Sequence, residues 1–173
     1  DPTNSSPINF TVTFSESVSG FTGSDVALSG TAGATTATVT GSGSTYNVAV
    51  SGMTSDGTVI ASIPANGAAD GAGNQNTAST SSDNTVTYDT TRPTVTINQA
   101  GGQADPTNAS PINFTVVFSE SVTGFTSGDV SLSGTATTGT VTVTGSGTTY
   151  NVAVAVSSDG SVSATVPANG ASD

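Results

Sequence analysis

The stretch Ile8-Asn9-Phe10-Thr11-Val12-Thr13-Phe14 alternates apolar and polar residues without a break. Successive side chains of a β-strand point to opposite faces, so this alternation predicts a strand with one buried face. The same pattern occurs at residues 46–50 and 59–63. No stretch combines a 3.6-residue apolar period with capping residues. The sequence therefore predicts an all-β protein with almost no helix.

The strand-forming stretch occurs twice in the chain. The segment from Asp1 to Val18 returns with few changes from Asp105 to Val122, an offset of 104 residues (Asp1 to Asp105). A unit of about a hundred residues is a usual size for a domain with its own core. We predict one domain at residues 1–90, which lacks its first strand, and a second at 91–173, which lacks its last strand. The chain is expected to be a window from a longer array.

Within one repeat, short predicted strands are separated by clusters of Gly, Ser, Asn and Asp, which favours a seven-stranded antiparallel Ig-like β-sandwich. The connection between the two copies is short, and Pro93 holds the preceding Arg92 in an extended conformation. A short, stiff connection favours an arrangement of the tandem sandwiches as a rod. The strands expected in the second copy are 94–98, 111–118, 129–133, 138–144, 149–154 and 161–166, and the seventh is expected at 84–89 in the first copy.

Composition argues against several classes of function. Twelve acidic residues and a single basic residue, Arg92, give a formal net charge of −11. Nucleic acids and anionic membranes are bound through Lys and Arg, so we expect neither as a partner. The chain has no His and no Cys, so a hydroxyl nucleophile would lack its usual general base, and we expect no enzyme activity. A Thr-rich chain without Lys favours an extracellular location on a bacterial cell surface.

The acidic residues all fall in predicted loops or at strand ends, and several should meet at one end of each sandwich. Carboxylates held close together suit Ca²⁺, which accepts irregular coordination by six to eight oxygen atoms. Solvated acids that keep the surface soluble are the alternative, and the sequence leaves both open. The candidate metal ligands are Glu16, Asp25 and Asp70 in the first unit, and Glu120, Asp129 and Asp173 with the connecting residue Asp89 in the second.

Four segments of this chain resemble bacterial Ig-like repeats, which form long arrays in surface proteins and large adhesins. They are INFTVTFSESVSGF at 8–21, Asp25-Val26, DGAGN at 70–74 and DTTRP at 89–93. The resemblance covers essentially the whole chain and implies a seven-stranded sandwich that serves as an extension module. Related calcium-dependent arrays hold Ca²⁺ at domain junctions through linker aspartates. In this sequence, the resemblance implies the set Asp89, Glu120, Asp129 and Asp173.

The leading hypothesis is a non-catalytic extension module of a bacterial adhesin or extracellular fibre, stiffened at its junctions by Ca²⁺. Its expected partners are the neighbouring repeats of the same chain. A second hypothesis is a filament whose subunits exchange strands with other copies, suggested by the missing first strand of one unit and last strand of the other. A third is a carbohydrate-binding module of a secreted enzyme, for which aromatic residues, at 5% of the chain, are scarce.

Overall fold

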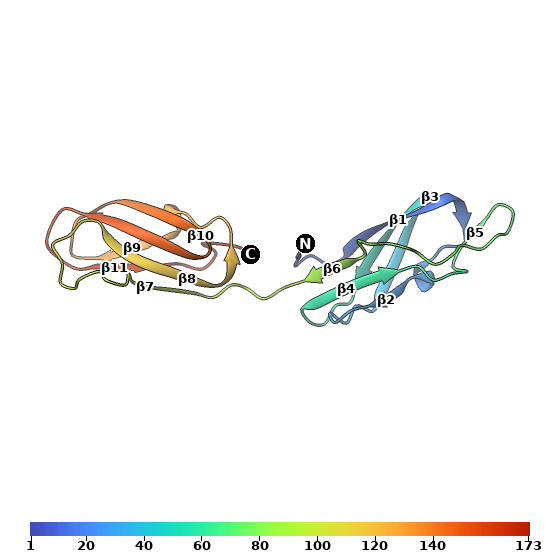
Figure 1. The fold of residues 1–173 in the computed structure, drawn as a ribbon, viewed down its shortest axis with the longest axis horizontal. Helices are drawn as coiled ribbons and strands as arrows, with labels where there is room; N and C mark the ends of the chain where they lie inside the picture. The colour runs from blue at the N-terminus through green and yellow to red at the C-terminus, as the bar shows by residue number, and fades with distance from the viewer. The chain divides into compact units, whose positions relative to one another are not determined.

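The computed structural model describes residues 1–173 and divides them into two compact units, Asp1–Thr91 and Arg92–Asp173. Each unit consists of antiparallel sheets, as predicted, and Figure 1 traces the first in blue to green and the second in yellow to red. The only helical segments are two short 3-10 turns, η1 (Gly23–Asp25) and η2 (Ser127–Asp129). The prediction of an all-β chain is confirmed.

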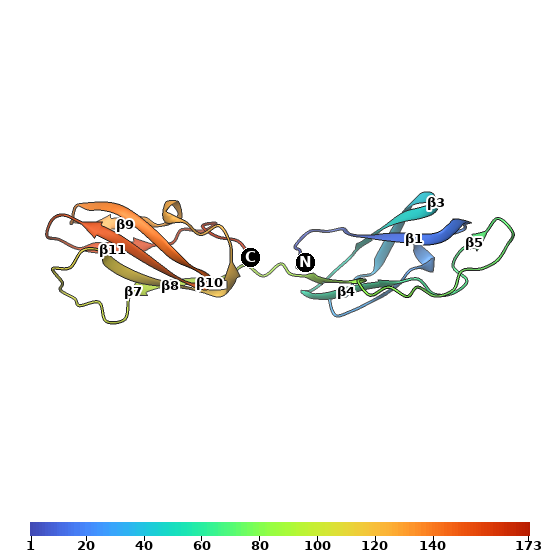
Figure 2. The same cartoon turned by 45° about the horizontal axis from the view of Figure 1, so that its top comes forward.

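The first unit contains two three-stranded sheets, with the strand orders β3-β1-β5 and β2-β4-β6. Figure 2 shows β1 and β3 on one side of this unit and β4 on the other, with the core between them. Near the start of the chain, Thr3 forms a parallel bridge with Tyr88. The N–H of Thr3 donates to Thr87 O at 2.9 Å, and the N–H of Asp89 donates to Thr3 O at 3.0 Å. The strands are β1 (Ile8–Ser19), β2 (Ala27–Ser29), β3 (Thr36–Ser51), β4 (Gly57–Ser62), β5 (Ala69–Asp70) and β6 (Thr85–Tyr88).

The second unit repeats this plan with one difference at each sheet. Its larger sheet has the order β10-β8-β7, so β8, the counterpart of β1, is paired with β7 where β1 is paired with β5. Its smaller sheet contains only β11 and β9. The strands are β7 (Val95–Gln99), β8 (Ile112–Val122), β9 (Ser131–Gly134), β10 (Thr138–Val156) and β11 (Val162–Thr165).

The long strands β3 and β10 each fold back on themselves. Ser157 N–H donates to Thr137 O at 3.0 Å, so the two ends of β10 lie side by side, whereas a straight strand of this length would separate them by about 60 Å. The chain reverses between Gly145 and Gly147, whose φ values of 116° and 69° lie in the region that favours glycine. Each long strand therefore contains two of the predicted strands, 138–144 and 149–154 in the second unit.

The alternating residues of the sequence form the core of each unit. Val48, Val50 and Val59 are fully buried in the first unit, as are Val116, Val152 and Val154 in the second. Side chains of this kind gain about 1.5–3 kcal/mol each on full burial. No charged or polar residue is buried, so the apolar alternation alone determines which face of each strand is inside.

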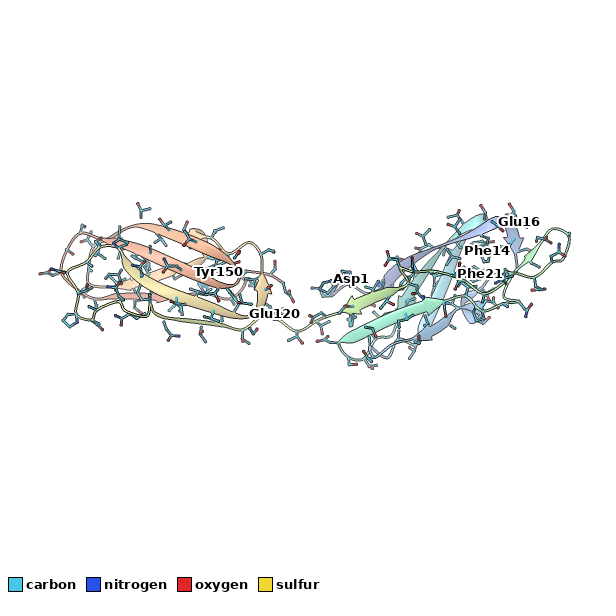
Figure 3. All side chains as sticks on the ribbon, viewed as in Figure 1. Asp1, Phe14, Glu16, Phe21, Glu120 and Tyr150 are labelled. Atoms are coloured by element: carbon cyan, nitrogen blue, oxygen red, sulfur yellow. The ribbon has the colours of Figure 1, made fainter.

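Three aromatic rings meet at one end of each core. Phe14, Phe21 and Tyr46 pack edge to face in the first unit, with ring centroids 5.2–5.8 Å apart, and Figure 3 shows Phe14 and Phe21 between the sheets. Phe118, Phe125 and Tyr150 form the same cluster in the second unit. The Tyr150 hydroxyl donates to Val122 O at 3.0 Å, which satisfies its one polar atom. Tyr46 and Tyr150 are both buried in the core of their unit.

The strand that carries the acidic residue Glu120 runs further than predicted. In β8, Val117 lies opposite Thr149, but the next pair is Val122 with Gly147, so residues 118–121 form an irregular bulge. In β1, the pair Thr13 and Thr45 is likewise followed by Val18 and Gly43. Bulges bend a strand and redirect its side chains. Glu16 and Glu120 therefore lie within bulged strands and not, as expected, at strand ends.

Candidate metal centre

Two of the predicted ligands in the second unit, Glu120 and Asp173, lie close together. Thr123 and Ser172 exchange two backbone hydrogen bonds, of 2.7 and 3.1 Å, and this bridge places the segment with Asp173 beside the end of β8. A carboxylate oxygen of Glu120 lies within 4.8 Å of one of Asp173. Glu120 is half-buried and Asp173 is exposed. Two like charges this close repel each other, and a cation shared by both carboxylates would remove that repulsion.

The corresponding acids of the first unit do not form such a group. Asp70 pairs with Val18, so it reaches the same place beside β1 that Asp173 reaches beside β8. Its carboxylate, however, is engaged within its own turn: Oδ1 accepts from the N–H groups of Ala72 and Asn74, and Oδ2 accepts from Asn74 Nδ2, all at 2.8 Å. Glu16, labelled in Figure 3, is exposed. Glu16, Asp25 and Asp70 do not bring three ligand atoms within 4.8 Å of one another.

Asp25 and Asp129 have a local structural role in both units. Oδ2 of Asp25 accepts from the N–H of Thr22 at 2.8 Å and from its hydroxyl at 2.7 Å. Asp129 makes the same two bonds, at the same distances, to Thr126. These reciprocal contacts form capping boxes, which satisfy backbone donors at the start of η1 and η2. They also explain why β9 begins at Ser131 and not, as predicted, at residue 129.

Asp89 lies in the segment that ends the first unit. Its N–H donates to Thr3 O, and its Oδ1 accepts from Thr91 N–H at 3.0 Å. Five residues further along, Thr94 exchanges hydrogen bonds with Ser119: Thr94 N–H donates to Ser119 Oγ and Ser119 N–H to Thr94 O, both at 2.9 Å. The chain that follows Asp89 therefore enters the second unit beside the residue that precedes Glu120.

Asp56 is a structurally important acid that the sequence analysis missed. Its Oδ1 accepts from the N–H of Thr90 at 2.8 Å and from the Thr90 hydroxyl at 2.7 Å, and its Oδ2 accepts from the Thr91 hydroxyl. The hydroxyl of Thr91, followed by that of Thr90, lowers the pKa of Asp56 below its usual value. The sequence contains a signal for this contact, because the adjacent residues Thr90 and Thr91 can both donate to one carboxylate, and Asp56 precedes Gly57 in a predicted turn. The sequence does not show which acidic turn the two threonines contact.

The turn around Asp70 should loosen in acid. The Asn74 side chain is the largest cause that lowers the pKa of Asp70 from 3.8. The pKa of Asp70 is lower in the folded state than in the unfolded state, where it is about 4. At pH values above the unfolded pKa, the ionised carboxylate therefore contributes its full stabilisation to the turn. This stabilisation is lost as the pH falls through the folded pKa. We expect the amide protection factors of Ala72 and Asn74 to fall as the pH drops below about 4, while those of β1 persist.

The control for this prediction is Asp70→Asn, which cannot accept the same set of hydrogen bonds as a carboxylate. It should show low protection at Ala72 and Asn74 already at neutral pH. Protection factors in the wild type that stay constant through this range, after correction for intrinsic exchange, would contradict the assignment.

Comparison with known proteins identifies one similarity. Residues 89–173 match the family model of a bacterial Ig-like domain. No curated protein and no solved structure matches the chain. The structure contains no helix with the length and hydropathy needed to span a bilayer.

Proposed function

We propose that this chain, whose residues 89–173 belong to the family of bacterial Ig-like domains, is a non-catalytic spacer of a bacterial surface adhesin or extracellular fibre. The observation that carries the proposal is the repetition of one sandwich, with its own core each time, in one chain. Each unit can fold on its own core, and a short connection joins it to the next. Such a chain adds length without needing a binding cleft of its own.

The surface composition supports an extracellular location. The chain carries one basic residue and no cysteine, and its polarity comes mainly from hydroxyl and amide side chains. A net charge of −11 keeps copies of the chain apart in solution. These properties suit a spacer that extends from a cell surface into the medium.

We further propose that Ca²⁺ stiffens the junction between units. The pair Glu120 and Asp173 supplies up to four carboxylate oxygens, the hard ligands that Ca²⁺ prefers. Asp89 precedes Thr94 by five residues, a span of at most about 17 Å, and is the proposed third carboxylate. Asp25 and Asp129 contribute to the structure through their capping boxes, and Glu16 and Asp70 are the proposed ligands at the other end of the first unit.

The calcium proposal predicts a large stabilisation of the second unit. A ligand present at a hundred times its Kd stabilises the folded state by about 2.7 kcal/mol, and each kcal/mol raises the Tm of a domain of this size by about 4–8 °C. Saturating Ca²⁺ should therefore raise the melting midpoint of the second unit by about 10–20 °C relative to EDTA. Calorimetry measures the melting midpoint of the second unit with Ca²⁺ and with EDTA. X-ray scattering on the same samples should show a narrower distribution of interatomic distances with Ca²⁺.

Matched variants separate a specific site from a general effect of the cation. Glu120→Gln and Asp173→Asn should each remove most of the shift, because each deletes one charge from the proposed site. Asp129→Asn also removes one negative charge, but Asp129 belongs to the capping box of η2. This variant should therefore have a lower melting midpoint than the wild type, while Ca²⁺ still raises its midpoint by the same amount. Equal midpoints in Ca²⁺ and EDTA for the wild type would refute the metal, and the spacer function would then stand without it.

A further inference from the structure

Two asparagines have a backbone conformation that few residues other than glycine adopt. Asn66 and Asn169 have φ values of 71° and 65°, and every other residue with a positive φ is a glycine. A non-glycine residue is uncommon in this left-handed region, although Asn tolerates it better than most. Each of the two is followed directly by glycine, and the chain contains no other Asn-Gly pair. The first pair lies in the turn between β4 and β5 (Figure 1).

The side chain of Asn66 is exposed and makes no contact that would hold it. Neither its oxygen nor its nitrogen forms a hydrogen bond with another residue. Gly67 has no side chain to shield its backbone nitrogen, and no other segment of the chain binds its N–H. Rotation about the bonds of Asn66 can therefore bring its carboxamide carbon, Cγ, to the backbone nitrogen of Gly67.

The chain on either side of Gly67 is held by Asn76. The N–H of Asn66 donates to Asn76 O at 3.0 Å. The N–H of Ala68 donates to Asn76 Oδ1 at 2.8 Å, and the N–H of Asn76 donates to Ala68 O at 2.9 Å. Asn76 Nδ2 also donates to Pro64 O at 2.9 Å. We call these four bonds the Asn76 clamp. They fix the length of chain between Asn66 and Ala68, and they do not include Gly67.

The same turn packs against the core and against the capping box of η1. Ala68 is 3% exposed and belongs to the core cluster of the first unit. A Cβ added to Gly67 would lie 2.9 Å from the Cβ of Asp25, so the two residues are in close contact. A change in the main chain at this turn therefore affects both a buried core residue and the segment that Asp25 caps.

We propose that Asn66 is a site of spontaneous deamidation, in which the next backbone nitrogen is the nucleophile and water is the only co-reactant. The nitrogen of Gly67 loses its proton to the solvent and attacks Cγ of Asn66. A bond forms between these two atoms, the bond from Cγ to Nδ2 breaks, and Nδ2 takes a proton from water and leaves as ammonia. The product is a five-membered succinimide ring that contains the main-chain carbonyl of residue 66.

Water then opens the ring at one of its two carbonyl carbons. Attack at Cγ breaks the new bond and leaves an aspartate with an unchanged main chain. Attack at the main-chain carbonyl leaves an isoaspartate, whose main chain runs through Cγ and is longer by a methylene group. Either product replaces a neutral amide with a carboxylate and adds a negative charge to the formal net charge of −11. This chemistry requires neither Ca²⁺ nor the spacer function.

Only the isoaspartate is incompatible with the Asn76 clamp. Its additional methylene group lies between the N–H of residue 66 and Ala68, where the four bonds fix the length of the chain. The bonds between Ala68 and Asn76 should therefore open, and Ala68 should withdraw from the core. Aspartate keeps the length of the main chain, so it should leave these bonds intact.

The test incubates the complete folded chain in mildly alkaline buffer made with ¹⁸O-labelled water and follows each asparagine by peptide mass spectrometry. Asn66 should gain ¹⁸O at least about tenfold faster than Asn4 and Asn108. Asn4 and Asn108 are matched controls, because their side chains are also exposed and unbound. The N–H that follows each of them, however, belongs to a residue with a side chain and donates to a threonine hydroxyl. Asn169 should react as Asn66 does.

Two variants separate the reaction from its effect on the turn. Asn66→Gly removes the carboxamide and accepts the same φ, so its turn should stay unmodified on incubation. Freshly prepared Asn66→Asp carries the charge on an unchanged main chain, so the amides of Ala68 and Asn76 should keep their protection from hydrogen exchange. The isoaspartate fraction of the aged wild type, isolated by chromatography, should lose protection at both amides by at least about tenfold.

Three results would overturn the proposal. In the first, Asn66 of the folded chain reacts no faster than Asn4 and Asn108. In the second, Asn66 reacts only after the chain is unfolded in urea, which would show that the turn shields it. In the third, isoaspartate forms but Ala68 and Asn76 keep their protection, which would show that the Asn76 clamp accepts the longer main chain.

Discussion

Replacing Phe125 with alanine should destabilise the second unit by about 3–5 kcal/mol. Phe125 is 7% exposed and packs edge to face against Phe118 at 5.3 Å and Tyr150 at 5.2 Å between ring centroids. The substitution removes the apolar contacts, leaves a cavity and ends two aromatic pairs that each contribute about 0.5–1.5 kcal/mol beyond area burial. A domain with a typical stability of about 5–15 kcal/mol would become marginal.

The measurement is chemical denaturation followed by NMR signals from each unit. Because the two units have separate core clusters, the midpoint of the first unit should not move. Phe21→Ala is the matched variant, since Phe21 holds the same place with Phe14 and Tyr46, and it should affect only the first unit. Equal shifts of both units in either variant would show that their stabilities are coupled.

Gly160→Ala should destabilise the second unit nearly as much, by about 3 kcal/mol. Gly160 has a φ of 146°, in a region open almost only to glycine. A Cβ added there would overlap the backbone nitrogen of Ala136 and come within 2.7 Å of Thr135 Oγ1. The backbone at this turn therefore cannot accept a side chain without moving the segment that packs against it.

Gly124→Ala is the control for this prediction. Gly124 also has a positive φ, 80°, but a Cβ added there meets nothing within 4 Å. It should therefore cost only the conformational strain of the left-handed region, about 1–2 kcal/mol. Equal melting midpoints for the two variants would mean that packing around Gly160 adds nothing to the backbone strain.

The fold followed from the sequence because alternation reports directly on burial. Val48, Val50 and Val59, all on predicted apolar faces, are fully buried. The same pattern placed Phe10, Val12 and Phe14 on an inner face, yet these residues are only half-buried. Alternation identifies the face that points inward, but the extent of burial depends on which strand lies alongside. The alternation within one strand does not contain that information.

The candidate site was less predictable, because a carboxylate has several possible roles at the same position. Asp25 and Asp129 were predicted metal ligands, and both accept hydrogen bonds within a capping box. The spacing Thr-x-x-Asp, seen at Thr22 and Asp25 and again at Thr126 and Asp129, was the available signal for that role. The approach of Asp173 to Glu120, by contrast, depends on the bridge between Thr123 and Ser172, which joins residues 49 positions apart.

The parallel bridge between Thr3 and Tyr88 has a mechanical consequence for the two segments that it joins. Opposed forces applied to these two segments along their length would slide them past each other, because they run in the same direction. The hydrogen bonds of Thr3 to Thr87 and Asp89 lie across that direction, so both bonds would resist the sliding together. A contact of this kind resists shear and is not opened one bond at a time.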